Sequence, residues 1–230
     1  MLAVAATTVD VNRFDNAAGA TFLTLDTIGL GHDGLLTNAG LLTPGGVGAL
    51  QTTELSGSFV QTGLGRFETD LDLGLLNTQY TDRINATGTA SIGGRFVAYE
   101  RNVTAITPGD RQSVLVSAPG GVTNTGASLS AVTSAIADFS LVFAPTTLSL
   151  RSNVDFATPG RTLNRNRTAV GDYFNRIQIA GSVPLLADTI TTLFYTPDAA
   201  SLGRRYDTFD GEIYAAQLAS AVSSADRFAG

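Results

Sequence analysis

The sequence predicts a mainly β protein, a parallel β-solenoid that is followed by a C-terminal α-helical segment. Asn, small residues and Gly precede an apolar strand in three stretches, at residues 16–22, 38–42 and 85–92. The first two begin 22 residues apart and the third begins 47 residues later, about two further periods. A period of about 20–25 residues is typical of stacked supersecondary units, in which Asn and Gly form the corners between short strands. After Phe156 the apolar spacing changes from that of strands to that of helices.

The low charge of the chain supports the same fold class. Only 15% of the residues are charged, against about 25% in an average globular protein, so Thr, Ser, Asn and Gly must form much of the surface. Such a surface suits stacked strands and tight turns better than a bundle of helices. We therefore expect a right-handed solenoid with a cap in residues 1–156 and an α-helical linker region in residues 157–230.

The clearest strand is GRFETDLDL at residues 65–73, where apolar and acidic residues alternate. One face carries Phe67, Thr69, Leu71 and Leu73, and the other carries Glu68, Asp70 and Asp72. This alternation predicts a half-buried strand with a solvated acidic face. Phe59, Phe67, Leu71 and Ile84 are expected to point into the core. Further strands are expected at GGRFVAYE, QSVLVSA and FSLVFAP, and a last one at residues 146–156.

The C-terminal part carries three stripes of apolar residues at helical spacing. They are Leu163, Val170, Tyr173, Phe174 and Ile177, then Leu185, Leu186, Ile190, Leu193 and Phe194, and finally Ile213, Tyr214, Leu218 and Val222. Gly181 fits a position at the end of the first helix, and Pro197 closes the second. A short helix is expected from Asp198, and Asp210 is suited to cap the last helix.

Composition also excludes several classes of function. The formal net charge is −6, no Lys is present and no basic patch is visible, so the chain is not expected to bind nucleic acid. No apolar run is long enough for a transmembrane helix, and residues 1–10 lack the features of a signal peptide. The absence of Cys suits a protein that crosses a narrow pore unfolded, because disulfides would block its passage.

Two pairs of stretches carry a resemblance to a known family. LSGSFVQTGLGRFETDLDL, followed by TDRINATGTASIGG, resembles the C-terminal passenger region of bacterial autotransporters, the self-secreting outer-membrane proteins of type V secretion. LNRNRTAVGDYFNRIQ is similar to the Asn-Gln-x-Ala-Val helix start of that family, with Arg167 where Gln is common. YDTFDGEIYAAQLASAVSSADRF is similar to the segment that leads into the membrane barrel.

The resemblance implies a passenger fragment at the bacterial cell surface or outer membrane, or secreted from it. Its implied partner is an outer-membrane β-barrel domain, whose strands are not contained in this sequence. The last helix would then occupy the barrel lumen, where a helix is suitable because it satisfies its own backbone hydrogen bonds. Within this family the end of the solenoid would act as a scaffold and as a folding seed for secretion.

The sequence contains few residues that could act in catalysis. His32 is the one His, it lies in the Gly-rich corner GLGHDGLL, and no Gly-x-Ser-x-Gly stretch accompanies it. We expect a solvated turn residue there, no enzymatic activity and no cofactor. Glu68, Asp70 and Asp72 are the only candidate metal ligands, but one strand cannot supply the six to eight converging oxygens that calcium prefers. A solvated acidic face is the favoured interpretation, and a cation site shared with a neighbouring strand is the alternative.

Three functions remain compatible with the sequence. The first is the structural and secretion role described above, which needs no catalytic group. The second is a surface adhesin or a self-assembling extracellular subunit, which would bind a ligand or another copy through the long side of the solenoid. The third, ranked behind both, is a secreted carbohydrate-active β-helix enzyme, which would need a pair of acidic residues flanking a groove.

Overall fold

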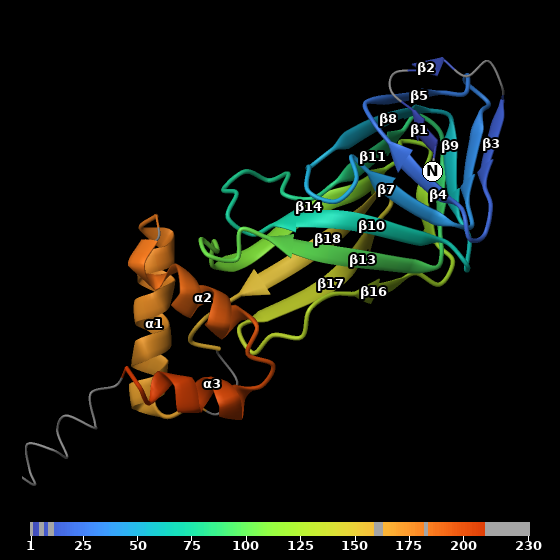
Figure 1. The fold of residues 1–230 in the computed structure, drawn as a ribbon. Coiled ribbons are helices and arrows are strands. Elements are labelled where there is room, and N and C mark those ends of the chain that lie inside the picture. The colour runs from blue at the N-terminus through green and yellow to red at the C-terminus, as the bar shows by residue number, and fades with distance from the viewer. Residues whose placement is uncertain (1, 5–6, 9–11, 159–162, 182–183, 210–230) are drawn as a thin grey trace, which may run out of the picture.

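The computed structural model describes residues 2–4, 7–8, 12–158, 163–181 and 184–209. These residues form a mainly β protein with a C-terminal helical segment (Figure 1). The strands are β1 (Leu2–Val4), β2 (Thr7–Thr8), β3 (Arg13–Asn16), β4 (Thr21–Thr24), β5 (Thr27–Gly29), β6 (Leu35–Asn38), β7 (Leu41–Pro44), β8 (Thr52–Ser56), β9 (Ser58–Gln61), β10 (Arg66–Asp72), β11 (Arg83–Ala86), β12 (Ala90–Ile92), β13 (Arg95–Arg101), β14 (Gly109–Ser117), β15 (Val122–Asn124), β16 (Ser128–Ser130), β17 (Ala137–Ala144) and β18 (Thr147–Val154). The helices are α1 (Arg165–Ile179), η1 (Pro184–Leu186), α2 (Ala187–Phe194) and α3 (Ala199–Tyr206).

The strands form three sheets in which the pairing is mostly parallel. One sheet has the order β1-β4-β7-β10-β13-β16, the second ends with β14-β11-β8-β5-β2, and the third has the order β15-β12-β9-β6-β3. Each strand from β1 to β13 therefore pairs in parallel with the strand three places later in the chain. From β1 to β16 the chain passes through the three sheets in a fixed order. One passage through all three sheets is called a circuit here, and each complete circuit adds one strand to every sheet.

The core lies between the three sheets, where inward-facing side chains of successive circuits stack in columns. In the first sheet, the register aligns Phe22, Leu42, Phe67, Phe96 and Leu129. The rings of Phe67 and Phe96 stack with centroids 5.0 Å apart. The four residues predicted to point inward, Phe59, Phe67, Leu71 and Ile84, are all fully buried. Alternation therefore identified the core correctly, because a strand that is buried on one face repeats its apolar residues every second position.

A second column consists of polar side chains. Asn16 donates from Nδ2 to Asn38 Oδ1 at 2.8 Å, and Asn38 donates from Nδ2 to Gln61 Oε1 at 3.1 Å. Asn16 and Asn38 open the first two predicted repeats, and they do occupy equivalent places in adjacent circuits. The third predicted repeat is wrong. Asn85 lies in β11 of another sheet, and the position equivalent to Gln61 in the next circuit is Ile92.

The reason is that the circuits differ in length. Asn38 and Gln61 are 23 residues apart, whereas the next hydrogen bond of the Gln61 side chain reaches 32 residues along, where its Nε2 donates to the Gly93 carbonyl at 3.0 Å. Most of the additional residues lie in β10, which has seven residues where β7 has four, and in the loop between β10 and β11. A fixed period fitted to the first two repeats therefore places the third in the wrong sheet.

The two ends of the β region differ in how their strands pair. At the C-terminal end, β18 pairs antiparallel with β14, and β17 pairs antiparallel with β18, so a hairpin replaces the parallel pairing. Figure 1 shows the helices beside this hairpin, while β1, β2 and β3 lie at the opposite end. The last strand ends at Val154, and α1 begins at Arg165 after the Asn164 side chain accepts a hydrogen bond from the Arg167 N–H.

Aromatic residues join the helices to the sheets. Phe174 of α1 lies with its ring centroid 5.9 Å from that of Phe156 and 6.0 Å from that of Tyr206 in α3. The Tyr206 hydroxyl donates to the Phe156 carbonyl at 2.6 Å. Gly171 allows this close approach, since a Cβ at that position would lie 2.4 Å from the same carbonyl oxygen. Within the described part of the chain, no helix is long and apolar enough to cross a membrane.

Candidate functional site

The acidic strand β10 is buried on both faces. Glu68 and Asp72 are each 9% exposed and Asp70 is 3% exposed, so the predicted solvated acidic face is wrong. The loop before β8 covers Asp70, since the Gly48 N–H donates to Asp70 Oδ2 at 2.7 Å. The pattern of alternation could not reveal this cover, because the covering loop is distant in sequence and carries no periodic signal.

Protein donors surround each of these carboxylates. Glu68 Oε1 lies 2.5 Å from Arg66 Nη2 and accepts from the Tyr99 hydroxyl at 3.0 Å. Asp70 Oδ2 also lies 3.3 Å from Arg101 Nη1. Hydrogen bonds of this kind satisfy buried carboxylates that would otherwise be costly to hold in the interior.

Asp72 closes the turn that follows β10. Its Oδ1 accepts from the Gly74 N–H at 3.0 Å and from the Leu75 N–H at 3.2 Å, and its Oδ2 accepts from Asn102 Nδ2 at 2.5 Å. Asn102 has a φ of 51°, a left-handed conformation that Asn tolerates better than most residues. The carboxylates of the three candidate metal ligands, Glu68, Asp70 and Asp72, therefore each contact a different set of protein donors. Among the residues the structure describes, no three His, Asp or Glu side chains gather as a metal site would need.

Asp82 is a buried acidic residue that the sequence analysis missed. It is 1% exposed, and its carboxylate accepts from the Gln51 N–H and from the Asp70 N–H, each at 2.7 Å. Burial raises the pKa of Asp82 to about 8, and the nearby Asp70 charge acts in the same direction. The two backbone N–H groups and Arg101 oppose this rise, because they favour the charged form. Asp82 thus links its own segment to those of Gln51 and Asp70 through hydrogen bonds. It follows a loop and belongs to no alternating or helical pattern, so the sequence analysis did not single it out.

His32 lies away from these groups at an exposed corner. Its Nδ1 is 2.9 Å from Asp33 Oδ1, and both side chains are almost fully exposed. A His–Asp contact in open solvent has no wall that could hold a substrate or exclude water. The contact therefore resembles an ordinary surface pair.

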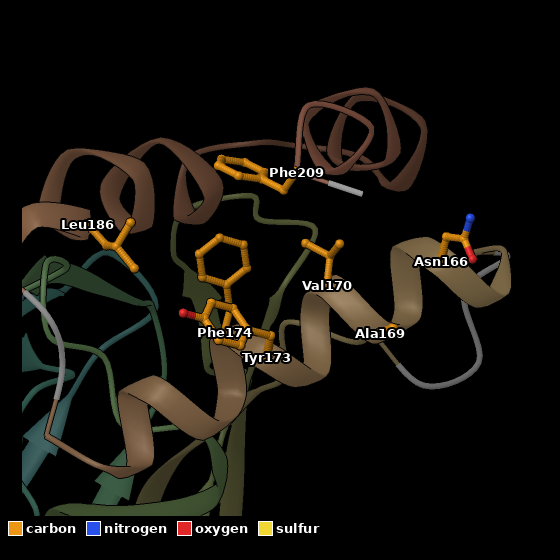
Figure 2. A pocket seen from close by; sticks show the side chains of 7 residues that line it. All are labelled: Asn166, Ala169, Val170, Tyr173, Phe174, Leu186 and Phe209. Carbon is orange, nitrogen blue, oxygen red and sulfur yellow. The ribbon is translucent and has the colours of Figure 1, made fainter. Parts of the chain in front are cut away.

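The helical segment contains an apolar pocket of about 400 Å³ (Figure 2). It is lined by Asn166, Ala169, Val170, Tyr173, Phe174, Leu186 and Phe209. Figure 2 shows Val170, Tyr173 and Phe174 rising from α1 on one side, with Phe209 opposite and Leu186 at the side. The first helical stripe predicted from the sequence supplied Val170, Tyr173 and Phe174. Phe209 was not predicted as part of this site, because it lies between two expected helices.

The chemistry of this pocket suits packing rather than catalysis. Asn166 is the one amide in the lining, and Tyr173 and Phe209 remain about half exposed. Beside the pocket, Arg167 Nε and Nη2 each lie 2.7 Å from the Asp207 carboxylate, which braces α1 against the end of α3. An apolar hollow with a braced wall can receive an apolar side chain, but it has no acid–base pair aimed into it.

A scan of the chain against models of known protein families finds no match, and a search of curated proteins finds no relative.

Proposed function

We propose that this chain is a non-catalytic autotransporter passenger fragment, which acts as a surface-exposed scaffold and as a folding seed for secretion. Residues 1–156 would be a right-handed β-solenoid with its cap, and residues 157–230 a helical linker to an outer-membrane β-barrel domain. The site of action would be the bacterial cell surface. The observation that carries the proposal is the closed end of the β region, where the β17–β18 hairpin ends the parallel stacking and the helices lie beside it.

The strand order supports the solenoid part of this proposal. Pairing of each strand with the one three places later is what a chain produces when it winds through three faces per turn. Stacked columns of apolar and amide side chains are the expected result, since equivalent positions of successive turns lie above one another. The column from Phe22 through Phe67 and the ladder of Asn16, Asn38 and Gln61 both have this form.

The closed end supports the seed role. An inner turn of such a stack buries its apolar surface only against its neighbours, so the first turn to fold lacks a partner. The hairpin provides that partner, because β18 pairs with β14 over eight residue pairs and β17 contacts the ends of the other two sheets. The Tyr206 hydroxyl and the Phe156–Phe174 contact then fix the helices to the hairpin side.

A matched pair of core variants tests the seed role in secretion. Leu36 and Leu150 are both fully buried, but Leu36 lies in β6 near the open end and Leu150 lies in β18 at the closed end. Each Leu→Ala change should cost about 2–5 kcal/mol of local packing. The chain would be placed between an epitope and an autotransporter barrel in a Gram-negative host, and protease access to the epitope on intact cells would be measured.

We expect Leu150→Ala to lower surface display several-fold and Leu36→Ala to change it little. We expect this difference because folding that begins at the closed end requires the hairpin, which contains Leu150, before it requires the strands near the open end, which include the one that contains Leu36. An equal loss for both variants would show that folding does not start at the hairpin, and the seed role would be wrong.

A further inference from the structure

Three stretches of the chain match Asn-x-Thr, the acceptor sequence of N-linked glycosylation. They are residues 85–87, 102–104 and 166–168. A glycosyltransferase joins a sugar to the Asn amide nitrogen only where the stretch can enter the acceptor site of the enzyme, which favours surface loops. The place of each stretch in the fold therefore decides which of the three can react.

Asn85, which begins the first stretch, lies inside a sheet. Its strand β11 pairs with β8 on one side and with β14 on the other. The side chain is held at both ends of its amide, since Nδ2 donates to Glu54 Oε1 at 2.6 Å and Oδ1 accepts from the Ser117 hydroxyl at 2.7 Å. An enzyme can reach this amide only after the sheet has opened.

Asn166, which begins the third stretch, lies in the first turn of α1. The hydroxyl of Thr168 in the same stretch donates to the Asn164 carbonyl at 3.0 Å. Arg167, between the two, forms an ion pair with Asp207 at 2.7 Å. Although Asn166 is exposed, this stretch can enter an acceptor site only if the first turn of the helix unwinds.

Asn102, which begins the second stretch, opens an exposed turn between β13 and β14. The Ala105 N–H donates to the Asn102 carbonyl at 3.2 Å, and Asn102, Thr104 and Ala105 are all exposed. The φ of 51° at Asn102 turns the chain out of β13, so the stretch lies outside the ladder of paired strands. Of the three stretches, this is the one that the fold presents on a surface loop.

The contact of Asn102 with Asp72 is compatible with a sugar on the same nitrogen. Asp72 Oδ2 accepts from Asn102 Nδ2 at 2.5 Å, and the nitrogen of a primary amide carries two hydrogens. One hydrogen serves the bond to Asp72, and the second is the one that a sugar replaces. The turn after β10 therefore keeps its bond from Asn102 when the amide is modified.

We propose that Asn102 is a site of N-linked glycosylation, with an oligosaccharide on a lipid pyrophosphate as the donor. Asn102 Nδ2 attacks C1 of the first sugar, and a bond between Nδ2 and C1 forms. The bond between C1 and the pyrophosphate oxygen breaks, the lipid pyrophosphate leaves with the electron pair, and one Nδ2 proton passes to a base of the transferase. The inference goes beyond the scaffold role, and it requires of the proposed function only that the chain is exported.

Sugar transfer to the purified, folded chain tests the site. The chain would be incubated with a lipid-linked oligosaccharide and an oligosaccharyltransferase that accepts Asn-x-Thr peptides, and mass spectrometry of the intact chain and of its peptides would locate the sugar. We expect a mass shift of one oligosaccharide, on Asn102. Synthetic peptides of residues 80–92, 97–109 and 161–173 are the matched controls, because all three should be modified once the fold no longer restricts access.

Variants of the chain separate the acceptor sequence from effects on folding. Asn102→Gln should abolish the mass shift, whereas Asn85→Gln and Asn166→Gln should leave it unchanged. Thr104→Val should also abolish the shift, and Thr104→Ser should retain it, because the acceptor sequence requires a hydroxyl at this position. The Thr104 pair keeps the test valid if Asn102→Gln disturbs the turn.

Two results would overturn the proposal. One is an unmodified folded chain when the peptide of residues 97–109 is modified in parallel, since the turn would then be closed to the enzyme. The other is equal modification of Asn85 or Asn166 in the folded chain, since the fold would then not select Asn102. The seed role is judged separately, because surface display of the Leu36 and Leu150 variants does not depend on sugar transfer.

Discussion

Phe67 gives the sharpest prediction at the scale of single residues. It is fully buried, and it lies between Leu42 and Phe96 in one column of the first sheet. Phe67→Ala should lower the free energy of unfolding by about 3–5 kcal/mol, because neighbours on both sides limit how far the cavity can collapse. Urea denaturation followed by circular dichroism measures the change. Leu76→Ala is the control, since Leu76 is 85% exposed and its loss should cost less than about 0.5 kcal/mol.

Asp82 predicts a pH dependence of stability. Its pKa is raised to about 8 in the folded state by burial, against about 3.9 in an unfolded chain. Between these values the folded protein holds a proton that the unfolded chain has released. The stability from this residue is therefore complete below about pH 4 and is lost as the pH rises through about 8, with a slope of up to about 1.4 kcal/mol per pH unit.

The change Asp82→Asn isolates this contribution. Asn does not titrate, but its amide nitrogen cannot accept from the Gln51 or Asp70 N–H, so the variant should be less stable than the wild type at pH 5. The difference between the two proteins should shrink as the pH rises from 5 to 9. Urea midpoints at pH 5, 7 and 9 measure it. A difference that stays constant over this range would mean that Asp82 is already ionised at pH 5.

The acidic strand shows what single residues in a sequence can and cannot predict. Phe67 and Leu71 were assigned to the core correctly, because their burial depends on the strand in which they lie. Asp70 was assigned to solvent wrongly, because its burial depends on the loop at Gly48 that covers it. Alternation reports which face of a strand is apolar, and it contains no information about what covers the polar face.

At the scale of elements, Tyr206 tests whether the helices are fixed to the β region. Its hydroxyl donates to the Phe156 carbonyl from a fully buried position. Tyr206→Phe keeps the ring contact with Phe174 but leaves that carbonyl without this donor, so we expect a loss of about 1–3 kcal/mol in urea denaturation. Tyr173→Phe is the matched control, because Tyr173 is half exposed and should change stability little. Equal effects of the two variants would contradict the role of the buried hydroxyl.

The elements also show why the predicted repeats were only partly correct. The two Asn corners at Asn16 and Asn38 were recognised because their circuits have nearly the same length. Asn85 was misplaced because the longer strand β10 and the loop after it lengthen the next circuit, and because Gln61, the true third member of the ladder, is not Asn. The first helical stripe, from Leu163 to Ile177, falls largely on α1, and Gly181 lies just past the end of that helix as predicted, because both are local signals.

At the scale of the whole molecule, the two ends of the β region differ in a way that composition could not predict. One end is closed by an antiparallel hairpin with the helices beside it, and at the other end β3 has no second strand partner among the described residues. The strands at the two ends also differ in length, since β17 and β18 have eight residues each and β1, β2 and β3 have two to four. Hydrogen exchange should therefore be slowest in β14 and β18 and fastest in β3, because edge amides open without disturbing the core.

The last prediction concerns residues 210–230, which lie outside the described residues. Their sequence places Ile213, Tyr214, Leu218 and Val222 on one stripe, while Ala and Ser occupy the opposite side in place of the charged residues of an ordinary surface helix. Small side chains allow close approach by a surrounding wall, and the resemblance to the autotransporter linker suggests that this wall is a barrel lumen. The alternative is that the segment docks within its own chain, for which the half-exposed pocket at Phe209 and Tyr173 offers a place.

Hydrogen exchange separates the two possibilities. The 230-residue chain would be compared with the same chain fused to an autotransporter barrel. Residues 212–226 should exchange fast in the chain alone and slowly in the fusion, since the lumen supplies the partner that the apolar stripe requires. The amides of α1 serve as an internal control, because their helix is already capped and docked on Phe156 in the chain alone. Equal and strong protection of residues 212–226 in both proteins would place the segment on its own chain, and the lumen role would then be wrong.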